Sequence, residues 1–146
     1  MEFFEREAAA KTFEYCTKVL NSPVTTQLPE GMNAFLLVEL DGNDEEVLMR
    51  DAERVMTVVE KFNSGEVLFA DSAAQKEELW KIRKNISPAV NWYTLTKSDD
   101  VVVPRGNLPK LISGIKDIGK GYGFNTVCFG HLGDGNLHVN ILKENI

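Results

Sequence analysis

The stretch Gly130-His131-Leu132-Gly133-Asp134-Gly135-Asn136-Leu137-His138-Val139-Asn140 decides the fold of this protein. It contains both histidines of the chain and its densest run of glycines. An apolar run precedes it and an alternating apolar and polar run follows, which is the pattern of two strands joined by a tight turn. The Asp-Gly pair inside the stretch is a typical corner of such a hairpin.

A two-residue turn at this Asp-Gly pair predicts which residues face each other across the hairpin. In that register, His131 lies directly opposite His138. Opposed residues have Cβ atoms roughly 4.5 to 5.5 Å apart, and residues two apart on a strand share a face of the sheet. The sequence therefore predicts a cross-strand pair of imidazoles, with Phe129 and Asn140 on the same face.

Two neutral imidazoles at that distance suit a shared divalent cation such as zinc, which needs a third and usually a fourth ligand. Two other interpretations stay open from the residues alone. The hairpin is equally compatible with a purely structural turn whose histidines lie at the surface, or with a dimer contact. The coincidence of His131, His138 and Asn140 on one predicted face favours the functional interpretation.

The composition is that of an ordinary globular domain. The chain has 146 residues, of which 43% are hydrophobic and 26% charged, enough for one domain with a core of its own. The net charge is -6 and there is no long run of lysine or arginine. This charge balance argues against a nucleic-acid partner, because the phosphate backbone is itself negative.

The two cysteines, Cys16 and Cys128, are far apart in the sequence and belong to no CxxC pair. Neither a disulfide framework nor a cysteine metal site is indicated, so we expect a reducing compartment. The charged N-terminus is not a signal peptide, and no apolar segment is long enough to span a bilayer. We expect a soluble, cytoplasmic chain, with peripheral membrane association of a longer intact protein left open. The helical pattern begins almost at Met1, and the chain stops at Ile146 soon after a predicted strand. We therefore also expect this chain to be part of a longer protein.

Hydrophobic periodicity, capping residues and breakers predict the other elements. They are a helix over 2–20, a buried strand over 34–40, a helix over 43–62, a strand over 66–70, a helix over 72–86 that Pro88 ends, a loop or edge strand over 91–98, a strand over 101–103 and a helix over 108–118.

This order predicts an α+β fold: a ferredoxin-like, split β-α-β antiparallel sheet with helices on one face, plus an inserted helix and loop. We treat residues 1–146 as a single domain. The chain has no GxGxxG after a strand and no GxxxxGK[ST], so it carries no nucleotide-binding fingerprint of its own.

One face of the helix predicted over 72–86 combines Trp80, Arg83 and Ser87 at spacings of three and four. A guanidinium beside a hydroxyl suits a small carboxylate, which arginine binds with two parallel hydrogen bonds. The alternative is a surface arginine that packs along Trp80 and pairs with a neighbouring glutamate. Lys97, at the end of the segment 91–98, has the same alternative of a solvated side chain.

Three segments in order resemble the C-terminal domain of FAD-linked oxidases: Leu79-Trp80-Lys81-Ile82-Arg83, then Asp99-Asp100-Val101-Val102-Val103-Pro104, then the hairpin stretch quoted above. That family includes the glycolate oxidase flavin subunit, D-lactate dehydrogenases and D-2-hydroxyglutarate dehydrogenase. The resemblance implies a cap domain on the substrate side of a flavin, which a separate N-terminal domain binds. It implies hydride transfer from a small 2-hydroxy acid to FAD.

The resemblance also implies roles for individual residues. His131 and His138 match the motif histidines that hold a divalent metal at the catalytic centre, and Asn140 matches an asparagine that contacts substrate. Arg83 and Lys97 match residues that bind the substrate carboxylate. A further substrate contact falls on Ser87, where the relatives have threonine.

Two departures limit what the isolated chain is expected to do. The family's metal and base chemistry also uses a later GEHGxG-like stretch, which this sequence lacks, and the flavin-binding domain is absent. We therefore expect this fragment of a cap domain to be inactive by itself and to hold a cation weakly. The competing function is a non-catalytic ferredoxin-like module that binds a metal or small acid. The residues select neither one acid nor an electron acceptor.

Overall fold

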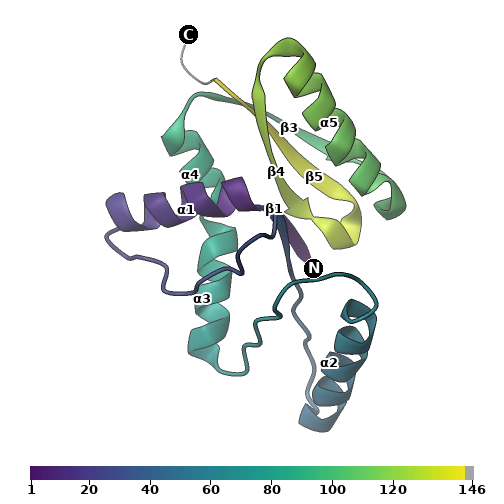
Figure 1. The fold of residues 1–146 in the computed structure, drawn as a ribbon. Helices are drawn as coiled ribbons and strands as arrows, with labels where there is room; N and C mark the ends of the chain where they lie inside the picture. Colours follow the sequence, from purple (N-terminus) through teal and green to yellow (C-terminus); the bar gives the residue numbers. More distant parts are fainter. Residues whose placement is uncertain (144–146) are drawn as a thin grey trace.

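The computed structural model describes residues 1–143. Five strands form one antiparallel sheet in the order β2-β1-β4-β5-β3 (Figure 1). The strands are β1 (Glu2–Glu5), β2 (Ala34–Leu37), β3 (Thr96–Val102), β4 (Asn125–His131) and β5 (Asn136–Leu142). The helices are α1 (Arg6–Lys18), α2 (Glu45–Val59), α3 (Ala73–Lys84), α4 (Ile86–Tyr93) and α5 (Leu108–Tyr122). Short 3₁₀ turns occur at Arg105–Asn107 and Leu132–Asp134.

The split β-α-β arrangement predicted from the sequence is formed by β3, α5 and β4. Both β3 and β4 pair antiparallel with β5, so they run parallel to each other with β5 between them. The helix α5 makes the crossover from β3 to β4. The α+β class is therefore confirmed.

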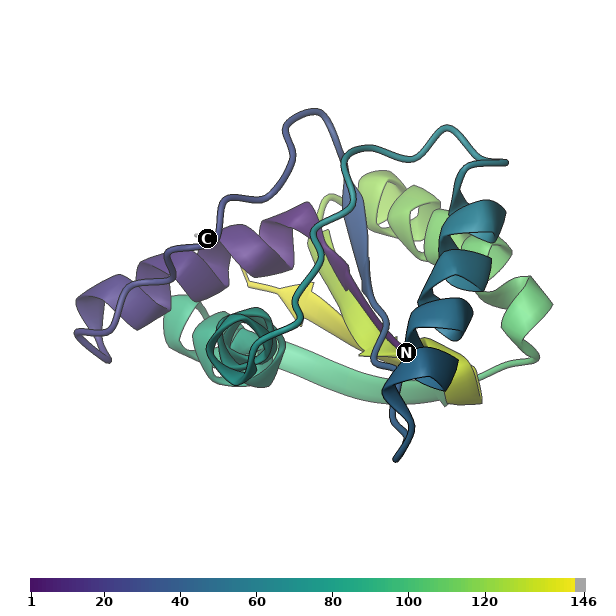
Figure 2. The same ribbon diagram turned by 90° about the horizontal axis from the view of Figure 1, so that it is seen from below.

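Helices cover both faces of the sheet, which corrects the expectation of helices on one face (Figures 1 and 2). On one face, α5 packs over the buried side chains of Phe3, Cys128, Leu137 and Val139. On the other face, α1, α3 and α4 contribute a core around the strand residues Phe4, Val127, Phe129 and Leu142. The physical reason is alternation: neighbouring residues on a strand project to opposite faces, and here both faces are apolar and need cover.

The N-terminus forms a strand before its helix, whereas the sequence predicts one helix over 2–20. Phe3 pairs with Gly130 and Phe4 pairs with Phe129, so β1 lies between β2 and β4 in the sheet. The tertiary pairing overrides local helix propensity here, because it buries Phe3 in one core and Phe4 in the other. This strand brings Glu2 into the sheet.

No residue between β2 and α3 is buried. The side chain of Asp44, rather than Asn43, accepts hydrogen bonds from the backbone N–H groups of Glu46 and Val47 at the start of α2. No residue of α2 is buried, and Figure 1 shows this helix apart from the others. The strand predicted over 66–70 does not form, and β2 is an edge strand that is half exposed.

The helix predicted over 72–86 ends at Lys84, and Pro88, which was predicted to end it, lies inside a second helix, α4. The capping box of Ser72 and Gln75 starts α3 as predicted. This helix ends at Lys84, and α4 begins at Ile86 with Pro88 in its first turn. Proline is tolerated there because the first N–H groups of a helix have no partner within the helix. None of the helices within residues 1–143 combines the length and the apolar character that a membrane crossing needs.

The hairpin between β4 and β5 exists, but its turn is longer than predicted. His131 pairs with Asn136, so four residues rather than two make the connection. Gly135 closes it with a left-handed backbone, φ 72°. A Cβ atom at this position would lie 2.1 Å from the carbonyl oxygen of Val103, so both conformation and space favour glycine.

Candidate active site

The two histidines lie on the same face of the sheet, the face that also carries Phe4 and Phe129. His138 pairs directly with Phe129, and His131 is therefore its diagonal neighbour. The predicted direct pairing of the two histidines is wrong, because the longer turn shifts the register. The shift preserves the face, and the two rings have centroids 5.6 Å apart at an interplanar angle of 78°.

Each imidazole has a carboxylate at its Nδ1 atom. On β3, Asp100 pairs with His138 across the sheet, and its Oδ1 atom lies 2.5 Å from Nδ1 of that ring. On β1, the Oε1 atom of Glu2 lies 2.9 Å from Nδ1 of His131. A carboxylate on one ring nitrogen orients the ring and leaves the other nitrogen for a ligand, which is the usual arrangement around metal-binding histidines.

Glu2 also contacts Arg83. Its Oε2 atom accepts a hydrogen bond from Nε of Arg83 at 2.8 Å, so one carboxylate joins α3 to the histidine of β4. Burial by itself raises the pKa of Glu2. The hydrogen bond to His131 and the positive charge of Arg83 outweigh burial, so the pKa lies below its ordinary value of 4.5. The carboxylate is therefore ionised at neutral pH.

Arg83 is buried between the sheet and α3, with 9% of its surface exposed. Its guanidinium lies 5.4 Å from the ring centroid of Phe129, and that same ring lies 5.1 Å from the ring of His138. Within residues 1–143, the Nη2 atom of Arg83 is buried and has no hydrogen-bond partner. A buried donor without a partner costs free energy, so an acceptor that reached this atom would be stabilised by it. The alternative of a surface arginine paired with a helix glutamate is excluded.

Asn140 follows His138 by two residues on β5 and therefore lies on the same face of the sheet, with 4% of its surface exposed. The Oγ of Ser98 on β3 donates to its Oδ1, and its Nδ2 donates to the carbonyl of Val127 on β4. The amide is therefore held in one orientation by both neighbouring strands.

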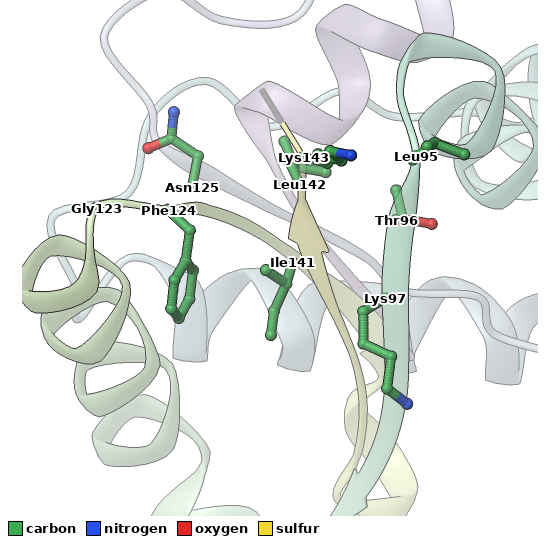
Figure 3. Close-up of a pocket in the computed structure, with 9 residues that line it drawn as sticks. All are labelled: Leu95, Thr96, Lys97, Gly123, Phe124, Asn125, Ile141, Leu142 and Lys143. Carbon is green, nitrogen blue, oxygen red and sulfur yellow. The ribbon is translucent and has the colours of Figure 1, made fainter. Parts of the chain in front are cut away.

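The site cluster consists of Arg83, His131, His138 and Asn140. Within residues 1–143, the predicted site residues Lys97 and Ser87 form no hydrogen bond or ion pair with it. Lys97 pairs with Ile141, which belongs to the face covered by α5, and its Nζ forms an ion pair with Asp99 at 2.9 Å. Figure 3 shows Lys97 beside Ile141 in a hollow at this end of the sheet, and neither histidine lines that hollow. Strand alternation places Lys97 on the face away from the histidines, whereas its neighbour Ser98 projects to their face. The role of Lys97 at the substrate carboxylate stays a prediction. Ser87 is exposed in the first turn of α4.

Sequence reasoning missed Glu2, Asp100 and Ser98. Ser98 and Asp100 are two residues apart on β3 and therefore project to the same face. Extending the predicted strand 101–103 toward the N-terminus would have placed both residues on that face. For Glu2 there was no usable signal, because its segment had the pattern of a helix. The described residues 1–143 contain no group of three or more His, Cys, Asp or Glu side chains that could hold a metal ion.

The structure is an α+β domain in which a buried arginine and two neighbouring histidine rings lie over one face of an antiparallel sheet. Residues 1–145 match the family described as FAD linked oxidases, C-terminal domain, and the chain belongs to that family. The resemblance derived from the three sequence segments is thereby confirmed.

Individual relatives agree with the family. The chain is 34% identical over 142 residues to a D-lactate dehydrogenase of Anaerostipes hadrus, covering 95% of this chain and 29% of the relative. It is 34% identical over 121 residues to the glycolate oxidase subunit GlcD of Escherichia coli strain K12, covering 80% and 23%. It is 35% identical over 147 residues to a D-2-hydroxyglutarate dehydrogenase of Stutzerimonas stutzeri, covering 97% and 30%. The chain thus spans less than a third of the length of these relatives.

Proposed function

We propose that this chain is the substrate-side part of an FAD-dependent enzyme that oxidises a small 2-hydroxy acid of the glycolate, D-lactate or D-2-hydroxyglutarate type. The names of the relatives support this class of substrate. The single observation that carries the proposal is the guanidinium of Arg83, which is buried, shares the carboxylate of Glu2 with His131 and has an Nη2 atom without a partner among residues 1–143. A carboxylate is the acceptor that best satisfies such a group.

The chain's own residues would bind and orient the acid. Arg83 would hold the substrate carboxylate through Nη2, because its Nε atom is already committed to Glu2. Asn140 would direct its amide, which Ser98 and β4 hold in place, toward the polar end of the substrate. The histidine rings of His131 and His138 would lie at the hydroxyl group that loses its proton.

His131 and His138 would hold a divalent cation such as zinc through their Nε2 atoms. Both Nδ1 atoms face carboxylates, and no hydrogen bond to either Nε2 is formed within residues 1–143, which fits two nitrogen ligands. The remaining ligands would come from substrate, water or other parts of a longer protein, because the described residues offer no third His, Cys, Asp or Glu. When bound, the cation would lower the pKa of the substrate hydroxyl.

FAD would be held mainly by a separate flavin-binding domain of the longer protein, since this sequence has no glycine-rich nucleotide motif. When bound, the flavin would accept the hydride from the carbon that carries the hydroxyl group. The role of this chain would be to position that carbon and to hold the substrate carboxylate in place during hydride transfer.

The test uses the full-length enzyme with a panel of 2-hydroxy acids and an artificial dye as electron acceptor, with and without a chelator. We expect turnover of at least one acid and its loss on chelation. Arg83→Ala should raise KM about 10- to 100-fold, because it removes a charge-assisted hydrogen bond. Arg54→Ala is the matched control, since Arg54 is exposed on α2 and pairs only with Asp51 among residues 1–143.

Unchanged kinetics of the Arg83→Ala variant across the whole panel would remove Arg83 from the site. Binding of the acids without any turnover in the flavin-loaded enzyme would instead favour the non-catalytic module.

A further inference from the structure

One carboxylate, that of Glu2, contacts two different members of the cluster with its two oxygen atoms. Oε2 accepts from Nε of Arg83 at 2.8 Å, and Oε1 lies 2.9 Å from Nδ1 of His131. The side chain of Glu2 is 12% exposed and that of Arg83 is 10% exposed, so water competes little for this contact. The pair is therefore a fixed part of the surroundings of His131.

When the ring of His131 is neutral, the chemistry of the three groups allows one arrangement of protons. Arginine is only a donor, and an ionised carboxylate is only an acceptor. His131 must then carry its proton on Nδ1, because the atom that faces it is a carboxylate oxygen. A neutral imidazole has a single N–H group, so Nε2 of His131 keeps its lone pair.

We propose that Glu2, held in place by Arg83, is a positioning residue that fixes the Nδ1–H tautomer of His131 and leaves the lone pair of Nε2 for a ligand. The tautomer follows from the contacts above, whereas its use for a cation rests on the proposed function. Asp100 makes the equivalent contact with Nδ1 of His138. The site thus presents two Nε2 lone pairs on one face of the sheet.

The glutamine variant of Glu2 tests the proposal sharply, because Arg83 dictates how the amide must lie. The amide oxygen has to face Nε–H of Arg83, since two donors repel each other. The amide NH₂ group then faces Nδ1 of His131, which must become the acceptor. Glu2→Gln therefore keeps the size of the side chain and its bond to Arg83 but moves the proton of His131 to Nε2.

Asp100→Asn is the matched control. Among the described residues, the carboxylate of Asp100 contacts only His138. An asparagine at position 100 is therefore free to turn its amide oxygen toward Nδ1 of His138. The same exchange of a carboxylate for an amide should therefore leave the tautomer of His138 unchanged. The double variant Glu2→Gln with Arg83→Met is a second control, since it removes the donor that dictates how the amide lies.

The measurement is ¹⁵N NMR of the imidazole nitrogens in the 146-residue chain, which has only two histidines. A His138→Gln variant assigns the two rings, and spectra are recorded at alkaline pH, where a free imidazole is neutral. We expect both rings to be protonated at Nδ1 in the wild type. In Glu2→Gln, His131 alone should change to the Nε2–H form, and the double variant should revert toward Nδ1–H.

The proposal would be overturned if His131 of the wild type were protonated at Nε2. It would also be overturned if Glu2→Gln kept the backbone amide spectrum of a folded protein while its His131 stayed protonated at Nδ1. Both rings of the wild type are expected in the Nδ1–H form, so the wild-type spectrum tests the proposal without an assignment and without the folding of any variant. These outcomes are independent of enzyme activity.

Zinc alone, added to the same samples, tests the use of the lone pair. Zinc should shift the Nε2 signals of the wild type, and Glu2→Gln should weaken zinc binding about 10- to 100-fold. If the wild type has the expected tautomer and binds no zinc, the metal part of the proposed function fails while the role of Glu2 in fixing the tautomer stands.

Discussion

The two faces of the sheet are built from the same strands and serve different purposes. The face under α5 is closed by apolar side chains, with Leu137 at 1% and Val139 at 9% exposure. The opposite face is apolar under α1, α3 and α4 but continues into the polar cluster around His131 and His138. Neighbouring residues such as Leu137 and His138 therefore have unrelated roles, and position on the strand decides which role each takes.

Two glutamates of β1 show the same contrast. Glu5 projects to the α5 face, where its Oε2 atom accepts from Nζ of Lys116 and from the backbone N–H of Cys128, both at 2.8 Å. These contacts fasten α5 and β4 to β1. Glu2 projects to the other face and contacts two side chains that are candidates for ligand binding. A carboxylate on this strand is structural on one face and part of the candidate site on the other.

The largest expected effect on stability is on the α5 face. Leu137→Ala should lower the free energy of unfolding by about 2 to 5 kcal/mol, because it leaves a cavity in a closed apolar core. Urea denaturation followed by circular dichroism measures the change.

Leu36→Ala is the matched control, since Leu36 is 58% exposed on the edge strand β2 and should change stability by less than about 0.5 kcal/mol. Equal effects of the two substitutions would contradict the difference between a closed core and an open edge.

Alkaline pH should act next most strongly, again on the α5 face. Burial raises the pKa of the Cys128 thiol from 9.0 to about 12, and the carboxylate of Glu5 adds to the rise. The unfolded chain therefore loses this proton first as the pH rises. The stability that the thiol contributes is complete below pH 9.0 and is lost between 9.0 and about 12. The loss should be about 2 to 4 kcal/mol, at about 1.4 kcal/mol for each pH unit.

The measurement is the difference in unfolding free energy between wild type and Cys128→Ala as a function of pH. This difference cancels the titration of lysines and tyrosines, which both proteins share. If this difference in unfolding free energy stayed constant from neutral to strongly alkaline pH, the Cys128 thiol would have the same pKa in the folded and unfolded chains, and the prediction would be wrong.

The smallest of these effects belongs to the site face. Ser98→Ala removes the hydroxyl that donates to Asn140 and leaves a buried amide oxygen with one partner fewer. We expect a loss of about 1 kcal/mol, as for a typical neutral hydrogen bond. Thermal unfolding measures it, with Ser113→Ala, an exposed position on α5, as the comparison. A loss as large as that of Leu137→Ala would mean that the site face carries as much of the stability as the core.

Much of this architecture could be predicted from local pattern. The two strands of the hairpin, the capping box at Ser72 and the amphipathic helix after Leu108 are all formed. The two histidines lie on the same face, as predicted, although the predicted turn is wrong. The longer turn shifts the register by two residues, and only a shift of one residue would have moved a histidine to the other face. The placement of Arg83 near these rings could not be predicted from spacing, because the partner that buries it comes from β1.

By itself the sequence determined the α+β class, the family and the common face of His131 and His138, because these depend on the order of elements, on quoted motifs and on the period of two in a strand. Only the tertiary structure decided that the N-terminal segment is a central strand, that Glu2 joins Arg83 to His131 and that Lys97 lies on the other face. Contacts of this kind join residues far apart in the chain, and no local pattern records which distant strand will pair with which.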